Sequence, residues 1–159
     1  MEFRRYAATL AVFATALYAA LLIAALGVLS VLLNRDVIDE PDAGPLAGPI
    51  AAGAAAAVVF VVLLVRARRS ERRAHDIAIG PALLAGIGSY VAYTVAGGVV
   101  VAVADPYRFV PFAVAQLIGP FAAAAGILSV VVVLLDMIVL SSRFDERGRP
   151  RWPWEKRGD

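Results

Sequence analysis

The sequence predicts an all-α integral membrane protein, in which a bundle of four helices crosses the cytoplasmic membrane and leaves both chain ends in the cytoplasm. Hydrophobic residues make up 61% of the 159 residues and the mean hydropathy is +0.79, whereas an average soluble domain is about 45–50% apolar. The charged residues occur in blocks separated by long uncharged runs, and most basic residues fall in alternate blocks. A chain of this length cannot bury so much apolar surface in a soluble core.

Four uncharged or nearly uncharged runs predict helices at about residues 7–33, 46–65, 77–104 and 110–140. Since about 20 apolar residues cross a hydrocarbon core of roughly 30 Å, each run is long enough to span it. A helix satisfies its backbone polar groups within one segment, as lipid requires, and no run alternates polar with apolar residues as a strand would. These helices make residues 1–140 one transmembrane domain, followed by a cytoplasmic tail.

The first run follows Arg4 and Arg5 and is 27 residues long. A secretory signal has an apolar core of only about 7–15 residues, so we expect a retained anchor helix. The second and third runs have Pro49 and Pro81 near their starts. A proline costs little there, because the first N–H groups of a helix have no partner within it.

The fourth run contains Pro120 well inside its length. This proline either kinks one continuous helix or marks the start of the true membrane span, with residues 109–118 as a lead-in segment at the membrane interface. Both alternatives are consistent with the sequence.

The distribution of arginine predicts the orientation. Thirteen of the 15 basic residues lie before the first helix, between the second and third helices or after the fourth, and only Arg35 and Arg108 lie in the other two loops. The positive-inside rule places the arginine-rich side in the cytoplasm. We therefore expect a multi-pass protein of the cell membrane with both termini cytoplasmic.

The two halves of the chain resemble each other at an offset of 71 residues. Residues 46–64 and 117–135 are identical at 11 of 19 positions, including a Gly-Pro pair. Runs rich in alanine and valine produce such matches by chance. The alternative is a tandem duplication of one helical hairpin, which gives two halves related by an axis along the membrane normal, a parallel repeat.

Small residues spaced along the helices predict close helix packing, because helices in lipid associate through van der Waals contact between backbones that approach closely. They face either the same bundle or a second copy or partner. The predicted packing residues are Gly48 and Ala52 in the second helix, Gly86 and Gly97 in the third, and Gly119 and Gly126 in the fourth run.

Asp136 is the only acidic residue inside an apolar run. A charge at the bilayer centre costs about 2.5–3.5 kcal/mol on insertion scales, so such a residue is a functional candidate. Because it lies near the end of its run, we expect it at the cytoplasmic boundary, paired with an arginine of residues 66–69 or with Arg143. Its role is either structural or that of a proton or cation site.

Tyr90, Tyr93 and Gln116 are further intramembrane polar candidates. They either line a small polar pathway or form hydrogen bonds between helices, which contribute about 0.6 kcal/mol each.

The loop between the second and third helices is rich in arginine. A basic residue near an anionic membrane surface contributes about 1 kcal/mol of attraction, so we expect contact with anionic lipid headgroups, although topology determination alone explains the pattern equally well. Nucleic-acid binding is not expected from so short a tethered loop. The arginines concerned are Arg66, Arg68, Arg69, Arg72 and Arg73.

The tail, residues 141–159, holds Trp152 and Trp154 among basic residues and prolines. Indole rings favour the headgroup zone, so both are expected as interface anchors; a docking peptide for a cytoplasmic partner is the alternative. This tail and the four-helix layout resemble small, uncharacterised four-transmembrane-helix proteins of high-GC bacteria. The resemblance implies an architecture and no activity.

The sequence favours a non-enzymatic membrane scaffold or interaction protein, which packs through its small-residue helix faces with a second copy or another membrane protein. The alternative is a small transporter or channel subunit. No cysteine is present, and no nucleophile, metal-binding group or acid–base cluster stands out. We therefore expect no enzymatic activity, no cofactor and no nucleic-acid partner, and we expect the lipid bilayer as the principal environment.

Overall fold

The computed structural model describes residues 2–38, 44–69 and 79–145, and these form helices and no strand. Four helices are long and apolar enough to cross a membrane, so the predicted all-α class is confirmed and the chain has the architecture of a multi-pass membrane protein. The elements are α1 (Glu2–Leu33), α2 (Ala47–Arg69), α3 (Ile79–Ala104), the 3₁₀ turn η1 (Pro106–Arg108), α4 (Phe109–Ile118) and α5 (Pro120–Asp145).

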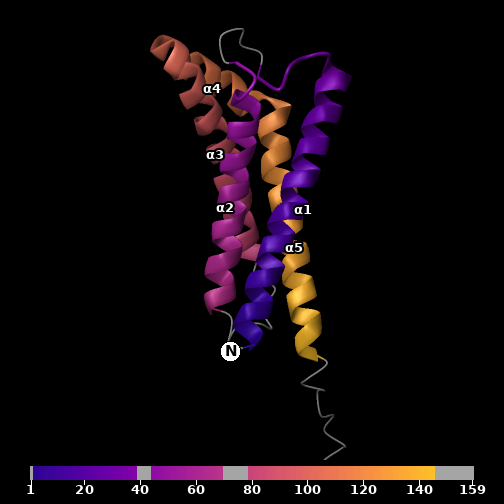
Figure 1. Ribbon diagram of the computed structural model, residues 1–159. Coiled ribbons are helices and arrows are strands. Elements are labelled where there is room, and N and C mark those ends of the chain that lie inside the picture. The colour runs from indigo at the N-terminus through magenta and orange to yellow at the C-terminus, as the bar shows by residue number, and fades with distance from the viewer. Residues whose placement is uncertain (1, 39–43, 70–78, 146–159) are drawn as a thin grey trace, which may run out of the picture.

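The four long helices run side by side in alternating directions (Figure 1). Both α1 and α3 pack against α2 and α5, so the helices form a ring in the order α1, α2, α3, α5. The start of α1 and the end of α5 lie at the same end of the bundle, which we call the inner end (Figure 1). The opposite, outer end carries α4 and η1.

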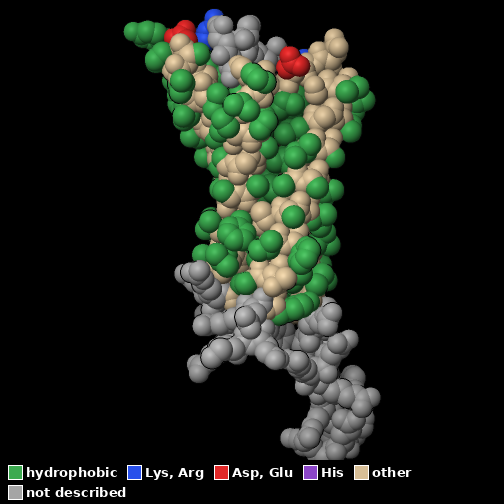
Figure 2. All heavy atoms as spheres, viewed as in Figure 1, with side chains coloured by type: hydrophobic (Ala, Val, Ile, Leu, Met, Phe, Trp, Pro, Cys, Tyr) green, Lys and Arg blue, Asp and Glu red, His purple; other side chains and the backbone are tan. Residues whose placement is uncertain are grey.

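Buried side chains recur every three or four residues along each long helix, as expected for one face of a helix. On α1 they include Ala14, Tyr18 and Leu22. The remaining faces are also apolar, and Figure 2 shows hydrophobic side chains over the surface between the two ends. A helix that is apolar all round suits a lipid environment, where the outside of the bundle faces acyl chains.

The end of α1 turns the chain toward α2 by a well-defined cap. Asn34 adopts a left-handed φ of 48°, its N–H bonds to the carbonyl of Val31, and the N–H of Arg35 bonds to the carbonyl of Ser30 at 3.2 Å. This is the Schellman arrangement, in which asparagine or glycine supplies the left-handed residue. It directs residues 35–38 across the outer end, between α1 and α2.

The fourth apolar run is broken at Gly119 and Pro120. Gly119 is extended, with ψ of 153°, because a following proline disfavours the helical conformation in the residue before it. α5 then begins at Pro120, which needs no N–H partner in the first turn. The single helix predicted over residues 110–140 is therefore two: α4 is a separate short helix, and the 21-residue span starts at Pro120.

Candidate functional site

The tightest helix contact joins α3 to α5 through Gly86 and Gly126. A Cβ atom on Gly86 would lie 2.5 Å from a methyl group of Val130 and 3.3 Å from the Gly126 carbonyl, and one on Gly126 would lie 3.1 Å from the Gly86 carbonyl. A side chain at Gly86 would require Val130 to shift, and one at Gly126 would make an unusually tight contact with the Gly86 carbonyl. The structure therefore brings together two predicted packing residues from different helices.

Helix α4 folds back onto α3 over a second pair of glycines. The ring of Phe112 would be 3.2 Å from a Cβ on Gly97, and the ring of Phe109 would be 2.9 Å from one on Gly98. Neither phenylalanine is among the residues that the sequence pattern predicts for helix packing. The signal that would have found them is an aromatic pair three residues apart, placed after a Gly-Gly pair in the neighbouring helix.

Two of the predicted polar residues support the break between α4 and α5. The hydroxyl of Tyr90 donates a hydrogen bond to the carbonyl of Leu117, one of the last carbonyls of α4, which has no partner within its own helix. The amide of Gln116 donates to the carbonyl of Val37 at 3.5 Å and so ties α4 to the segment after α1. Both residues thus have structural hydrogen bonds at the outer half of the bundle.

Tyr93 lies apart from Tyr90 and Gln116, in the middle of the bundle. Its side chain is fully buried, and it belongs to the same core cluster as Tyr18 of α1. The predicted set of Tyr90, Tyr93 and Gln116 is therefore divided between two places and forms no single pathway among the described residues.

Asp136 lies near the inner end of α5, in the last turn of the span, and is 8% exposed. Its carboxylate attracts the guanidinium of Arg66 on α2, while its Oδ1 accepts no hydrogen bond from the described part of the chain. Ala7, Ala67 and Leu140 pack together at this end. The structure thus places the charged pair where α1, α2 and α5 converge.

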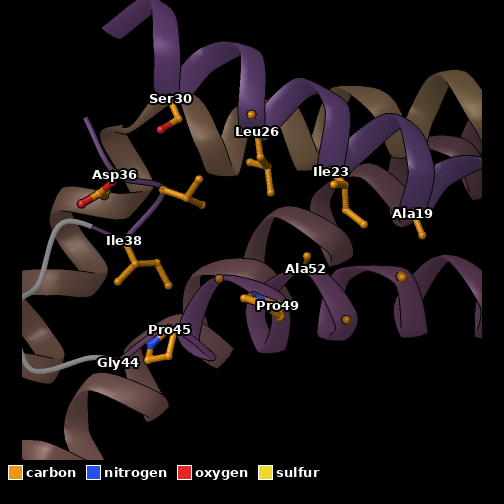
Figure 3. A pocket seen from close by; sticks show the side chains of 15 residues that line it. Ala19, Ile23, Leu26, Ser30, Asp36, Ile38, Gly44, Pro45, Pro49 and Ala52 are labelled. Carbon is orange, nitrogen blue, oxygen red and sulfur yellow. The ribbon is translucent and has the colours of Figure 1, made fainter. Parts of the chain in front are cut away.

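An open groove separates α1 from α2 in the outer half of the bundle (Figure 3). Its volume is about 980 Å³ and its lining is mostly apolar. Figure 3 shows Ile23 and Leu26 of α1 pointing toward α2, with Ala52 on the facing wall. Ser30 and Asp36 supply polar groups toward its outer end.

The wall of the groove on α2 is formed by Gly48, Ala52 and Ala56, which we call the groove row. These residues are partly exposed, whereas the neighbouring row of Ala47, Ala51 and Ala55 is fully buried in the bundle. The predicted packing residues Gly48 and Ala52 therefore do not form the core face of α2. They lie one position away from it: Ala52 and Ala56 pack partly against the core, and the groove row also borders the groove.

Several predicted contact residues lie outside the part that the structure describes. These are the loop residues Arg72 and Arg73 and the tail residues Trp152 and Trp154. Arg68 and Arg69 are in the last turn of α2. Within residues 2–38, 44–69 and 79–145, no group of three acidic, histidine or cysteine side chains is placed to hold a metal ion.

The chain belongs to the family described as "Family of unknown function (DUF6121)", whose model matches residues 1–159. This agrees with the resemblance to an uncharacterised family. No curated protein and no solved structure matches the chain.

Proposed function

We propose that this protein is a non-enzymatic, multi-pass protein of the cytoplasmic membrane that binds a transmembrane helix of a partner protein in the groove between α1 and α2. The observation that carries the proposal is the groove row, which faces the open groove. Small side chains let helix backbones approach, and helices in lipid associate mainly through such contact. In contrast, the space beside Gly86 of α3 and Gly126 of α5 is already occupied, because each glycine packs against the backbone of the other helix.

The shape of the groove favours a helix as its occupant. The lining runs along α1 from Ala19 to Ser30, which is about 16 Å at 1.5 Å per residue and just over half of a hydrocarbon core of roughly 30 Å. A lipid chain would fill the same space, but it would gain little from a flat row of glycine and alanine. A helix gains close backbone contact from that row.

Filling the groove tests this function. Ala52→Leu adds a branched side chain to the groove row, and Ala57→Leu is its matched control, because Ala57 is exposed on the same helix and does not line the groove. After affinity purification from native membranes, we expect one defined partner with the wild type and with Ala57→Leu, and at least tenfold less with Ala52→Leu. Equal recovery with both variants would remove the basis of the proposal.

We also propose that the inner end faces the cytoplasm and that its arginines contact anionic headgroups. The distribution of basic residues supports this orientation, since α2 ends at Arg69 on the inner side and Arg108 lies at the outer end. The chain has no cysteine, so single cysteines report on topology directly. A membrane-impermeant maleimide should label Tyr107→Cys in intact cells and Ser70→Cys only after lysis; the opposite pattern would reverse the orientation.

The burial pattern supports a tandem duplication. Buried residues of α1 map onto buried residues of α3 at the 71-residue offset: Ala11, Ala14, Tyr18, Leu22 and Leu26 correspond to Ala82, Ala85, Ser89, Tyr93 and Gly97. The agreement of α2 with α5 is partial, since Ala51 and Ala55 correspond to the buried Ala122 and Gly126 but Ala67 corresponds to the exposed Ile138. An alignment of relatives that lose the 71-residue register would rule out the duplication.

A small transporter or channel is the second candidate function. Asp136 supports it, because this carboxylate is buried near the inner end and has an oxygen without a hydrogen bond from the described residues. Reconstituted vesicles loaded with a cation-sensitive dye would show flux that Asp136→Asn lowers if this function applies. Flux no greater than in protein-free vesicles would exclude conduction of the cations assayed.

A further inference from the structure

The groove between α1 and α2 occupies only the outer half of the bundle. Its lining on α1 runs from Ala19 to Ser30 (Figure 3), and Ala19 is at the middle of the span Tyr6–Leu33. Farther toward the inner end the two helices close on each other, since Ala7 and Ala67 belong to one buried cluster. A helix in the groove therefore contacts this protein mainly near its own outer end, so the groups at the outer mouth of the groove decide which helix fits.

Asp36 lies at this mouth. Of the described residues that line the groove, it alone is charged. Its side chain is exposed, and Figure 3 shows it beside the outer end of the groove, beyond Ser30. In the described part of the chain, no hydrogen bond or ion pair engages its carboxylate. The groove thus combines apolar walls with one carboxylate at its outer end.

The backbone on both sides of Asp36 is tied to neighbouring helices. The hydroxyl of Ser30 on α1 donates to the carbonyl of Arg35 at 2.7 Å. The amide of Gln116 on α4 donates to the carbonyl of Val37 at 3.5 Å. These bonds hold the peptide groups that flank Asp36, so its carboxylate stays near the mouth before any partner binds. A group held in place in this way loses less conformational freedom on binding.

A helix placed beside Asp36 removes part of the water around its carboxylate. Desolvating a charge costs free energy unless an opposite charge or hydrogen-bond donors replace the water, and the attraction between opposite charges grows in less polar surroundings. An apolar helix end would leave the carboxylate unpaired, and an acidic one would be repelled. The sequence around it acts in the same sense, because residues 34–46 include four acidic residues and one basic residue. A cationic helix end is therefore the complement of this mouth.

We propose that the helix bound in the groove carries a lysine or arginine at its outer end and that this cation pairs with Asp36; the proposal rests on the groove function proposed above. In the orientation proposed there, the outer end is not cytoplasmic, and on that side of a membrane lysine and arginine are uncommon next to membrane spans. A cation at this position therefore distinguishes the partner from most transmembrane helices. The penalty of leaving Asp36 unpaired acts against the others.

Removing the charge of Asp36 while the groove stays open tests the ion pair. Affinity purification from native membranes compares the wild type with Asp36→Asn, Asp36→Glu and Asp105→Asn. Asp105 is the matched control, because it is an outer carboxylate that pairs with Arg108 and does not line the groove. We expect Asp36→Asn to recover about fivefold less of the partner that Ala52→Leu also loses. Asp36→Glu and Asp105→Asn should recover as much as the wild type.

Ala52→Leu, measured in parallel, separates failure of the ion pair from failure of the groove function. Loss with Ala52→Leu but full recovery with Asp36→Asn would overturn the ion pair and leave the groove function standing. Full recovery with Ala52→Leu would remove the groove function and the ion pair with it. Equal losses with Asp36→Asn and Asp105→Asn would indicate a general effect of outer negative charge and would overturn a specific contact at the mouth.

Charge exchange tests the contact directly. The partner lost with both Ala52→Leu and Asp36→Asn should have a lysine or arginine in the outer turn of its helix, and a partner without one would overturn the proposal. Asp36→Lys should lose the partner, and changing the partner's basic residue to glutamate should restore recovery with Asp36→Lys. Loss without restoration would contradict direct pairing. An amine-bearing phospholipid that Asp36→Asn loses, with no protein following the same pattern, would show a lipid occupant and would also overturn the proposal.

Discussion

The α3–α5 and α1–α2 interfaces both contain rows of small residues, but only the α3–α5 interface is closely packed. Between α3 and α5, a Cβ atom on Gly86 would overlap Val130, and one on Gly126 would make an unusually tight contact with the Gly86 carbonyl. Between α1 and α2, the groove row borders about 980 Å³ of open space, and Gly53, which also lines the groove, has nothing within 4 Å of its Cβ position. Small residues therefore mark one contact that is complete within the chain and one that is not.

Because of this difference, substitutions at the α3–α5 interface should affect the stability of the fold, and substitutions in the groove should affect binding of a partner. A filled glycine contact contributes to the folded state of the isolated chain, so substitutions there change its free energy of unfolding. Ala52 and Ala56 of the groove row pack only partly against the core, and their groove-facing sides gain contact only when another molecule occupies the groove.

Gly86→Val should destabilise the bundle by roughly 3 kcal/mol, because the new side chain overlaps Val130 and the opposing backbone. Gly53→Val is the matched control and should change the free energy of unfolding by about 0.5 kcal/mol or less, since a Cβ there meets open space. Unfolding in mixed micelles measures both. Equal effects would mean that the two interfaces do not differ.

Arg66→Gln should destabilise by about 1–2 kcal/mol, because it leaves the buried carboxylate of Asp136 without its cation. The value is below the range for a fully buried pair, since Arg66 is only partly buried. Combined with Asp136→Asn, the loss should be smaller than the sum of the two single losses. Arg108→Gln is the control: it removes an exposed ion pair with Asp105 and should have almost no effect on stability. Additive losses for Arg66→Gln and Asp136→Asn would show that these two charges act independently.

Tyr90→Phe should cost about 1 kcal/mol, because it frees the Leu117 carbonyl at the end of α4. Tyr107→Phe provides the control, since Tyr107 is 92% exposed and its variant should be neutral. The same unfolding assay applies. A neutral Tyr90→Phe would mean that the break between α4 and α5 does not need this bond.

The four membrane spans could be predicted because length and charge decide them, and neither depends on how the helices pack. The side of each helix that faces the core of the bundle could not be predicted. Every face of α2 is apolar, so the sequence offers no contrast between lipid-facing and core-facing sides. This is why the predicted row of Gly48 and Ala52 differs by one position from the buried row of Ala47 and Ala51.

The contacts that α4 makes by folding back onto α3 also could not be predicted from the sequence. Pro120 allowed a kink or a new start, and the choice depends on α4 packing onto α3, where Phe109 and Phe112 fill the space above two glycines. Likewise, Tyr90 and Tyr93 are three residues apart, yet one bonds across to Leu117 and the other is fully buried in the same core cluster as Tyr18. Only the arrangement of neighbouring helices separates them.

The most direct test of the groove is photo-crosslinking from within it. A diazirine amino acid replaces Ile23, which lines the groove, or Ile87, which does not; their exposed fractions are 66% and 65%. In native membranes, we predict a crosslink from position 23 to a transmembrane segment of one partner protein and no such crosslink from position 87. Crosslinks from position 23 to lipid alone or to a second copy of this chain, or identical products from both positions, would contradict the proposal.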